Sequence, residues 1–291
     1  MHWGGRALDL VFTPEPPPPP DFGEHADTGL YRLTHEAVEY PVLPPFSWLI
    51  EHVVLPNFTA FGWLTLLVES VLAVLLLTGT AVRLAALIGV GQSIAIGLST
   101  AEAPGEWPWA YAMQIGIHLV LLLTPCAQYA AVDAVRAATA RGVGAPVARR
   151  LLCGWGTVLA VTGFVALVVS LGNAWRAPLG GLVGYEKLEF SLGSYNLVGA
   201  LVLLAASAFM LAAALARVPV LASAAVVLAA AAAVSIYVQL GRTDVWLGAT
   251  ATTAAVFVCA AVVAAATRRL LEQSAPATDV DASRSPETQG D

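Results

Sequence analysis

The feature that most constrains this chain is a series of apolar runs, each about as long as a membrane-crossing helix. A helix rises about 1.5 Å per residue, so about 20 apolar residues cover a hydrocarbon core of about 30 Å. Of the 291 residues, 58% are hydrophobic and only 12% are charged, whereas soluble domains carry about a quarter charged residues. The sequence therefore predicts an all-α polytopic membrane bundle rather than a soluble domain or a β-barrel. The predicted spans are 58–80, 84–100, 109–124, 151–171, 195–216, 220–240 and 245–266.

The arginines indicate how these seven spans are oriented. Basic residues gather in alternate connections, and the acidic connection with Glu102 and Glu106 falls on the opposite side. By the positive-inside rule this pattern predicts a cytoplasmic C-terminus in a bacterial plasma membrane. With seven spans, residues 1–57 then lie outside without a signal peptide, so we expect that a first helix is missing. The arginines concerned are Arg83, Arg136, Arg141, Arg149, Arg150, Arg217, Arg268 and Arg269.

The chain divides into five predicted parts. Placing Arg83 on Arg217 superimposes the first three spans on the last three. This match suggests two parallel four-helix repeats, of which the first lacks its first helix. The parts are a proline-rich segment with interfacial helices (1–57), a first membrane bundle (58–135), a basic cytoplasmic loop (136–150), a second membrane half (151–269) and a disordered cytoplasmic tail (270–291).

Four polar residues inside the first three spans are the strongest candidates for a functional site: Glu69, Gln92, Gln114 and His118. Counted along the helices, Glu69 lies about 16 Å deep and His118 about 14 Å deep, near the midplane. Ionisable groups at that depth are costly and normally face a partner. We therefore expect Glu69 and His118 to share a proton as catalytic groups, with Gln92 and Gln114 at the head group of a ligand. The alternative is a polar network that only holds the helices together.

Residues at the span ends are weaker candidates for ligand binding. Trp107 and Trp109 are at the depth of an aromatic belt, and Glu106 beside them is a candidate gate. Arg83 is either a ligand-binding group or a cation that reaches lipid phosphates. Asp133 is interpreted as a surface partner of Arg136.

Several classes of function and cofactor find no support in the sequence. The net charge is −6 and no basic patch suggests nucleic acid. The three cysteines have no metal-ligand spacing, and no metal site is predicted. Motifs for flavin, haem or iron–sulfur clusters are not visible.

The first spans resemble the DoxX/DoxD-like membrane proteins. The run FGWLTLLVESVLAVLLLTGTAVRLAAL has that family's central glutamate, Glu69, and its LxxGxxxR turn, Leu76, Gly79 and Arg83. The segment EWPWAY at 106–111, with His118 and Asp133, is similar to the family's closing helix, and PDFG at 20–23 to the segment after its first helix. The likeness covers about residues 20–136 and implies a four-helix membrane domain. It also implies a redox setting like that of the small subunit of thiosulfate:quinone oxidoreductase, with a quinone cofactor and a partner subunit.

Three functional hypotheses follow. The first is an integral membrane subunit of a quinone-linked oxidoreductase, with Glu69 and His118 near the quinone. The second is a non-catalytic membrane scaffold or a small-molecule permease. The third is a lipid-modifying enzyme that uses the loop at 172–194. The sequence leaves the substrate open, and also whether the protein forms a homo-oligomer.

Overall fold

The protein is an all-α, multi-pass membrane helix bundle, as the sequence predicts. The structure is a computed structural model that describes residues 29–171, 183–185, 188–190, 193–239, 246–248 and 251–272. Six of its helices are long and apolar enough to cross a membrane, and a seventh apolar helix, α6, is shorter. The seven are α4 (Phe58–Thr78), α5 (Val82–Thr100), α6 (Pro108–Leu123), α8 (Gly144–Ser170), α9 (Leu197–Ala216), α10 (Pro219–Gln239) and α11 (Ala251–Glu272).

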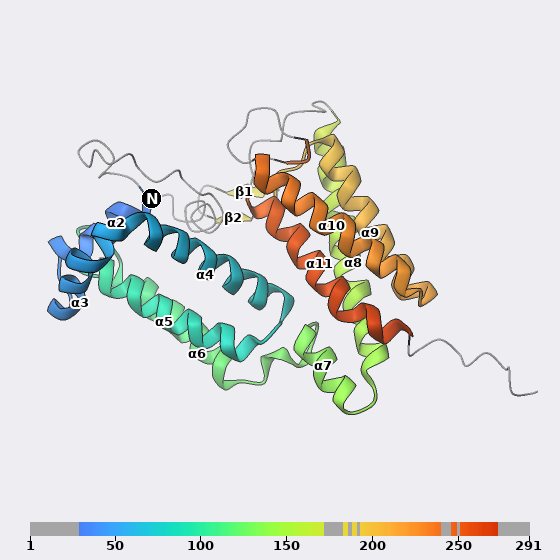
Figure 1. The fold of residues 1–291 in the computed structure, drawn as a ribbon, viewed down its shortest axis with the longest axis horizontal. Coiled ribbons are helices and arrows are strands. Elements are labelled where there is room, and N and C mark those ends of the chain that lie inside the picture. Colours follow the sequence, from blue (N-terminus) through green and yellow to red (C-terminus); the bar gives the residue numbers. More distant parts are fainter. Residues whose placement is uncertain are drawn as a thin grey trace, which may run out of the picture.

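The second half of the chain forms a closed four-helix bundle. Helix α8 packs on α9 and α11, and α10 packs on α9 and α11, as Figure 1 shows. Alanines on all four helices let the backbones approach closely, and larger side chains such as Leu203, Met210 and Phe257 are fully buried among them. The large apolar core lies in α7 to α11 and the segments that join them, and it contains no residue of α4, α5 or α6.

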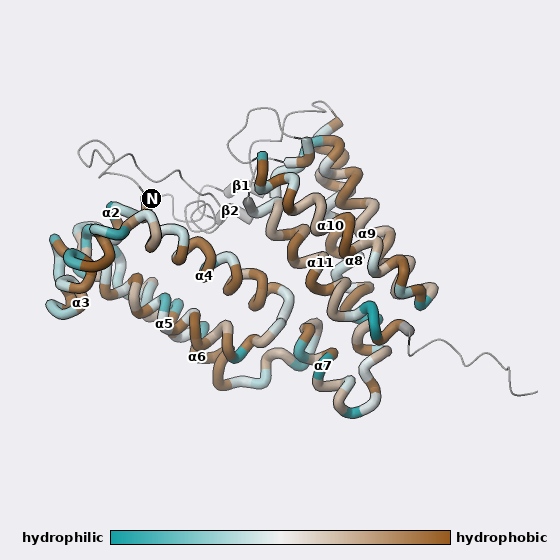
Figure 2. Tube along the Cα trace, viewed as in Figure 1, coloured by the Kyte–Doolittle hydropathy of each residue, from teal (hydrophilic) through white to brown (hydrophobic). Residues whose placement is uncertain are grey.

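The first half is more open. Helix α5 packs closely on α6, whereas α4 touches α5 and, across the gap between the halves, α11. The apolar stretch of α4 contains no buried residue. Figure 2 shows it mostly in the hydrophobic colour, while α5 carries a hydrophilic patch. The first half therefore presents most of α4 to lipid and keeps polar groups between its helices.

The N-terminal segment carries short helices at one end of the first half. Helix α2 (Gly29–Glu39) packs on α5, and α3 (Pro44–Leu49) continues through a π-helical turn (Ile50–Val54) and a 3-10 turn (Leu55–Asn57) into α4. This agrees with the predicted interfacial helices, whereas the proline run at 16–20 lies outside the described residues. We call this end, where α4 begins and α5 ends, the acidic end, and the opposite end the arginine end.

The structure corrects two predicted boundaries. The predicted loop at 136–150 is largely helical, because α7 (Val132–Ala140) extends into it and α8 already begins at Gly144. Helix α7 is held in place by its buried side chains, Val132, Val135 and Ala138. The last helix starts at Ala251 rather than at Val245. Leu247, which precedes this helix, bonds to a distant segment instead: its carbonyl oxygen accepts a hydrogen bond from the Asn196 amide at 3.2 Å.

Other features outside the helices are small. Two three-residue strands, β1 (Val183–Tyr185) and β2 (Leu188–Phe190), form an antiparallel hairpin. Most of the predicted loop at 172–194 and most of the tail at 270–291 lie outside the described residues.

The proposed repeat is compatible with this arrangement but is not tested by it. Helices α4 and α9 both end on a left-handed residue, Gly79 with φ 65° and Arg217 with φ 58°. The turns thus correspond at Gly79 and Arg217, a shift of one helical turn from the predicted match at Arg83. Within the described residues, nothing in the first half corresponds to α8.

Candidate functional site

Glu69 lies in the middle of α4 on the side that faces α5. Its Oε1 accepts a hydrogen bond from Gln92 Nε2 at 2.6 Å, so the carboxyl and the amide join the two helices inside the apolar layer. The other amide atom, Gln92 Oε1, is buried without a hydrogen-bond partner. An unpaired buried acceptor is costly. The pair therefore offers one unused acceptor to a hydroxyl or amide donor.

His118 lies on α6 and contacts α5 at Ser93, the residue that follows Gln92. Its Nδ1 is 2.9 Å from the Gln114 carbonyl oxygen and 3.3 Å from Ser93 Oγ. Because a carbonyl only accepts, the neutral imidazole carries its proton on Nδ1, which leaves Nε2 as an acceptor. Gly89 makes this position accessible, since a Cβ there would overlap the imidazole ring.

The structure brings Glu69, Gln92 and His118 to the same level of α5, as predicted, but Glu69 and His118 bond to different residues of that helix. Glu69 bonds to Gln92, and His118 to Ser93, the next residue on α5. Glu69 and His118 make no direct hydrogen bond with each other in this structure, and a proton shared between them stays a prediction. Ser93 is a member of the site that the sequence reasoning missed. A serine beside Gln92 at the level of His118 was the available signal.

Gln114 and the tryptophans lie away from this level or point outward. The backbone carbonyl of Gln114 holds His118, but its side chain is exposed. Trp107 and Trp109 are 61% and 69% exposed at the acidic end, which fits an aromatic belt. Glu106 accepts a hydrogen bond from the Tyr111 hydroxyl at 2.7 Å. Trp109 is nine residues from His118, about 14 Å along α6.

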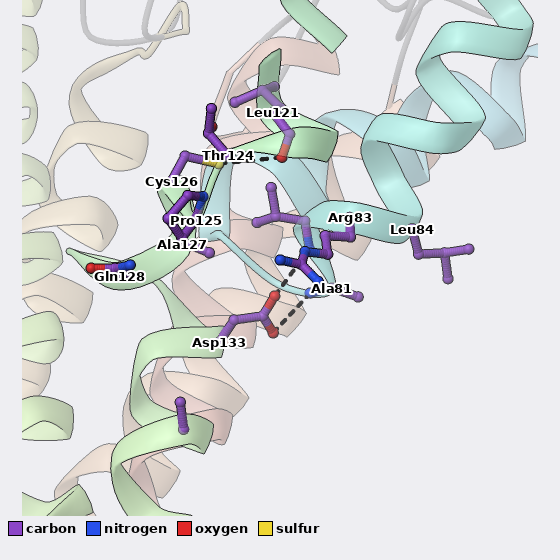
Figure 3. Close-up of a pocket in the computed structure, with 12 residues that line it drawn as sticks. Ala81, Arg83, Leu84, Leu121, Thr124, Pro125, Cys126, Ala127, Gln128 and Asp133 are labelled. Atoms are coloured by element: carbon purple, nitrogen blue, oxygen red, sulfur yellow. Dashed lines mark hydrogen bonds between the residues drawn. The ribbon is translucent and has the colours of Figure 1, made fainter. Parts of the chain in front are cut away.

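Arg83 lies at the arginine end in the wall of an open depression of about 300 Å³. Figure 3 shows it beside Asp133, where α5 begins. Arg83 is exposed and, within the described part of the chain, has no acidic partner. It is nine residues from Gln92, about 14 Å along the helix. This position suits contact with lipid phosphates and separates Arg83 from the Glu69 level.

Asp133 has a structural task that the sequence did not reveal. Its two carboxylate oxygens accept from the amides of Ala81 and Val82, each at 3.0 Å, and its own amide donates to Gly79 at 3.0 Å. The first amides of a helix have no partner within the helix. Asp133 therefore caps α5 from a distant part of the chain. The predicted ion pair with Arg136 also forms, at 3.3 Å.

Comparisons with protein-family models, with curated proteins and with solved structures find no match for this chain. The site is therefore interpreted from its own geometry.

We expect Gly89→Ala to displace His118 and to destabilise the first half. The added methyl group overlaps the imidazole, and overpacking of this kind costs about 1–3 kcal/mol. Gly91→Ala is the matched control, because no atom lies within 4 Å of its Cβ position. Thermal unfolding in detergent and the imidazole NMR signals report the effect. Equal unfolding temperatures and imidazole signals in the two variants would contradict the packing of His118 against Gly89.

Asp133→Ala should lower the thermal unfolding temperature by removing both bonds to the start of α5. Loss of a capping side chain costs about 0.5–2 kcal/mol. Arg136→Ala removes only the exposed ion pair, which is worth about 0–1 kcal/mol. An Arg136→Ala variant that is as unstable as Asp133→Ala would assign the stabilisation to the ion pair instead.

Proposed function

We propose that this protein is an integral membrane subunit of a quinone-linked redox system, and that Glu69 and Gln92 handle the proton of the quinone head group. The observation that carries the proposal is a carboxyl–amide pair at 2.6 Å between two membrane helices, with one buried acceptor unused. An ionisable side chain at that depth is a functional candidate by default.

The distribution of charge between the halves supports this location. In the described parts of α8 to α11, charged residues occur only near helix ends. Glu69 instead lies at the centre of α4, about 16 Å from its start. A carboxyl group placed there is not needed to build a membrane bundle, because the second half closes without one.

The available atoms fit a quinol head group. Its hydroxyl groups are donors, and the unused acceptor atoms of the site are Gln92 Oε1 and, in the neutral ring, His118 Nε2. A bound quinone would supply two-electron redox chemistry coupled to protons. The carboxyl group of Glu69 would hold or release a proton, and the amide of Gln92 pairs with either form, because it contains both a donor and an acceptor. Apolar residues exposed along α4, among them Leu64, Leu67 and Val71, leave the lipid side open to an apolar ligand.

The resemblance to DoxX/DoxD-like proteins supports the same proposal. Among its motif residues, Glu69 joins α4 to α5, and Asp133 bonds to Gly79 and to the start of α5. The chain carries no motif for a flavin, a haem or an iron–sulfur cluster, so a partner subunit would supply the substrate oxidation.

One observation favours a second candidate, a non-catalytic scaffold. Helices α4 and α5 make few other contacts with each other, so the Glu69–Gln92 bond also holds these two helices together. A permease is a further form of this alternative.

The test is redox-induced infrared difference spectroscopy on the protein extracted with its native lipids. We expect a bound quinone by mass spectrometry and a carboxyl band that changes when the quinone is reduced. Glu69→Gln should keep the fold and lose this band, because the amide cannot exchange a proton. Glu102→Gln, an exposed carboxyl at the acidic end, is the control and should keep it. A folded protein without quinone, or an unchanged spectrum in Glu69→Gln, would favour the scaffold.

A further inference from the structure

Helix α2 places an acidic side chain in a buried position at the acidic end. It packs on α5 with Ala37 fully buried and with Glu36 only 7% exposed. Acidic residues are almost never buried to this degree without a full set of partners. The position of Glu36 therefore requires an explanation that the packing of α2 alone does not give.

The partners of Glu36 satisfy only half of its carboxyl group. Oε1 accepts from Arg32 Nε at 3.2 Å, on the water-exposed side of the helix. Oε2 is buried and has no hydrogen-bond partner. A buried, unpaired carboxylate oxygen is unfavourable, whereas a protonated one is neutral and can donate.

Glu106, on the connection between α5 and α6, acts on Glu36 from the neighbouring element. Burial raises the pKa of Glu36, the Arg32 guanidinium partly offsets this, and the negative charge of Glu106 raises it further. Glu106 is fixed by the Tyr111 hydroxyl, which donates to its Oε2 at 2.7 Å.

The other charged or titratable groups near Glu36 do not replace this interaction. Glu39, on the same helix, also raises the pKa of Glu36, but its side chain is 53% exposed and it pairs with His35 at 3.5 Å. Glu51 and His52, on the π-helical turn that packs on α2, are exposed, and Glu51 Oε2 lies 3.7 Å from His52 Nδ1.

We propose that Glu36 and Glu106 form a proton-binding site that holds α2 against the end of α5 and the connection between α5 and α6. With the proton bound, Glu36 is neutral inside the contact and its carboxyl hydroxyl is a hydrogen-bond donor. Without it, the negative charges of Glu36 and Glu106 repel each other and Glu36 keeps an unpaired charged oxygen, so the contact weakens. This proposal does not depend on the quinone proposal, because it concerns only the docking of α2.

The sign of the pH dependence follows from linkage. The pKa of Glu36 is raised when α2 is docked, so docking favours the protonated form. The stabilisation is fully present below the pKa of the undocked carboxyl, about 4.3. It is lost as the pH rises through the docked pKa.

Hydrogen exchange of peptides that cover Gly29–Glu39, in the full-length protein, tests the site. After correction for the intrinsic pH dependence of exchange, we expect protection to fall as the pH rises above about 4.3, roughly tenfold for each unit of pKa difference between the docked and undocked forms. Glu36→Gln should hold protection at the low-pH level throughout, because the amide is neutral. Glu39→Gln is the matched control on the exposed side of α2 and should keep the transition.

A second variant keeps the proposal testable if Glu36→Gln fails to fold. Glu106→Gln still accepts from Tyr111 but removes the negative charge, so it should shift the transition to lower pH. Protection in the unaltered protein that does not change with pH would overturn the proposal. So would an unchanged transition in Glu36→Gln or in Glu106→Gln, or a Glu36→Gln helix that is unprotected at every pH.

Discussion

The structure depends on one constraint of its surroundings: a hydrocarbon layer offers no hydrogen bonds, so polar groups within it must be satisfied by the protein. Helices satisfy most of the backbone, and the difficulty moves to the helix ends. Asp133 bonds to the first amides of α5 from 51 and 52 residues away, and Asn196 accepts from the Gly199 amide at the start of α9. The buried hydroxyl of Ser170 donates to the Tyr195 carbonyl oxygen. These few side chains connect the helix ends and fix how the helices are joined.

The same constraint explains why the two halves differ. The second half buries small and apolar residues around a common core, and its polar side chains mostly bond to backbone carbonyl oxygens, as Ser207 of α9 does to Gly156 of α8. The first half has little apolar core of its own and holds its helices through Glu69 with Gln92 and His118 with Ser93. The same layer contains the buried acceptor Gln92 Oε1, which has no hydrogen-bond partner.

The quality of the sequence predictions followed the range of the interactions involved. Helix positions were recovered because the length of an apolar run is a local property, and α4, α5 and α6 begin within two residues of the predicted starts. Glu69, Gln92 and His118 were recovered as a group, because depth along a helix can be counted from its end. The start of α11 was missed, because Leu247 pairs with Asn196, far away in the sequence.

By itself, the sequence determined the membrane class, the approximate number of helices and the depth of each polar group, since these depend on composition and on the helical rise. Only the tertiary structure decided which group meets which. Glu69 pairs with Gln92 rather than with His118, Asp133 bonds back to the start of α5, and Glu36 becomes buried where the charge of Glu106 acts on it. Lipid tails are as apolar as the side chains of another helix, so hydropathy does not distinguish a face that meets lipid from one that meets protein. The pairing is instead decided by where glycine allows close approach and where polar atoms find partners.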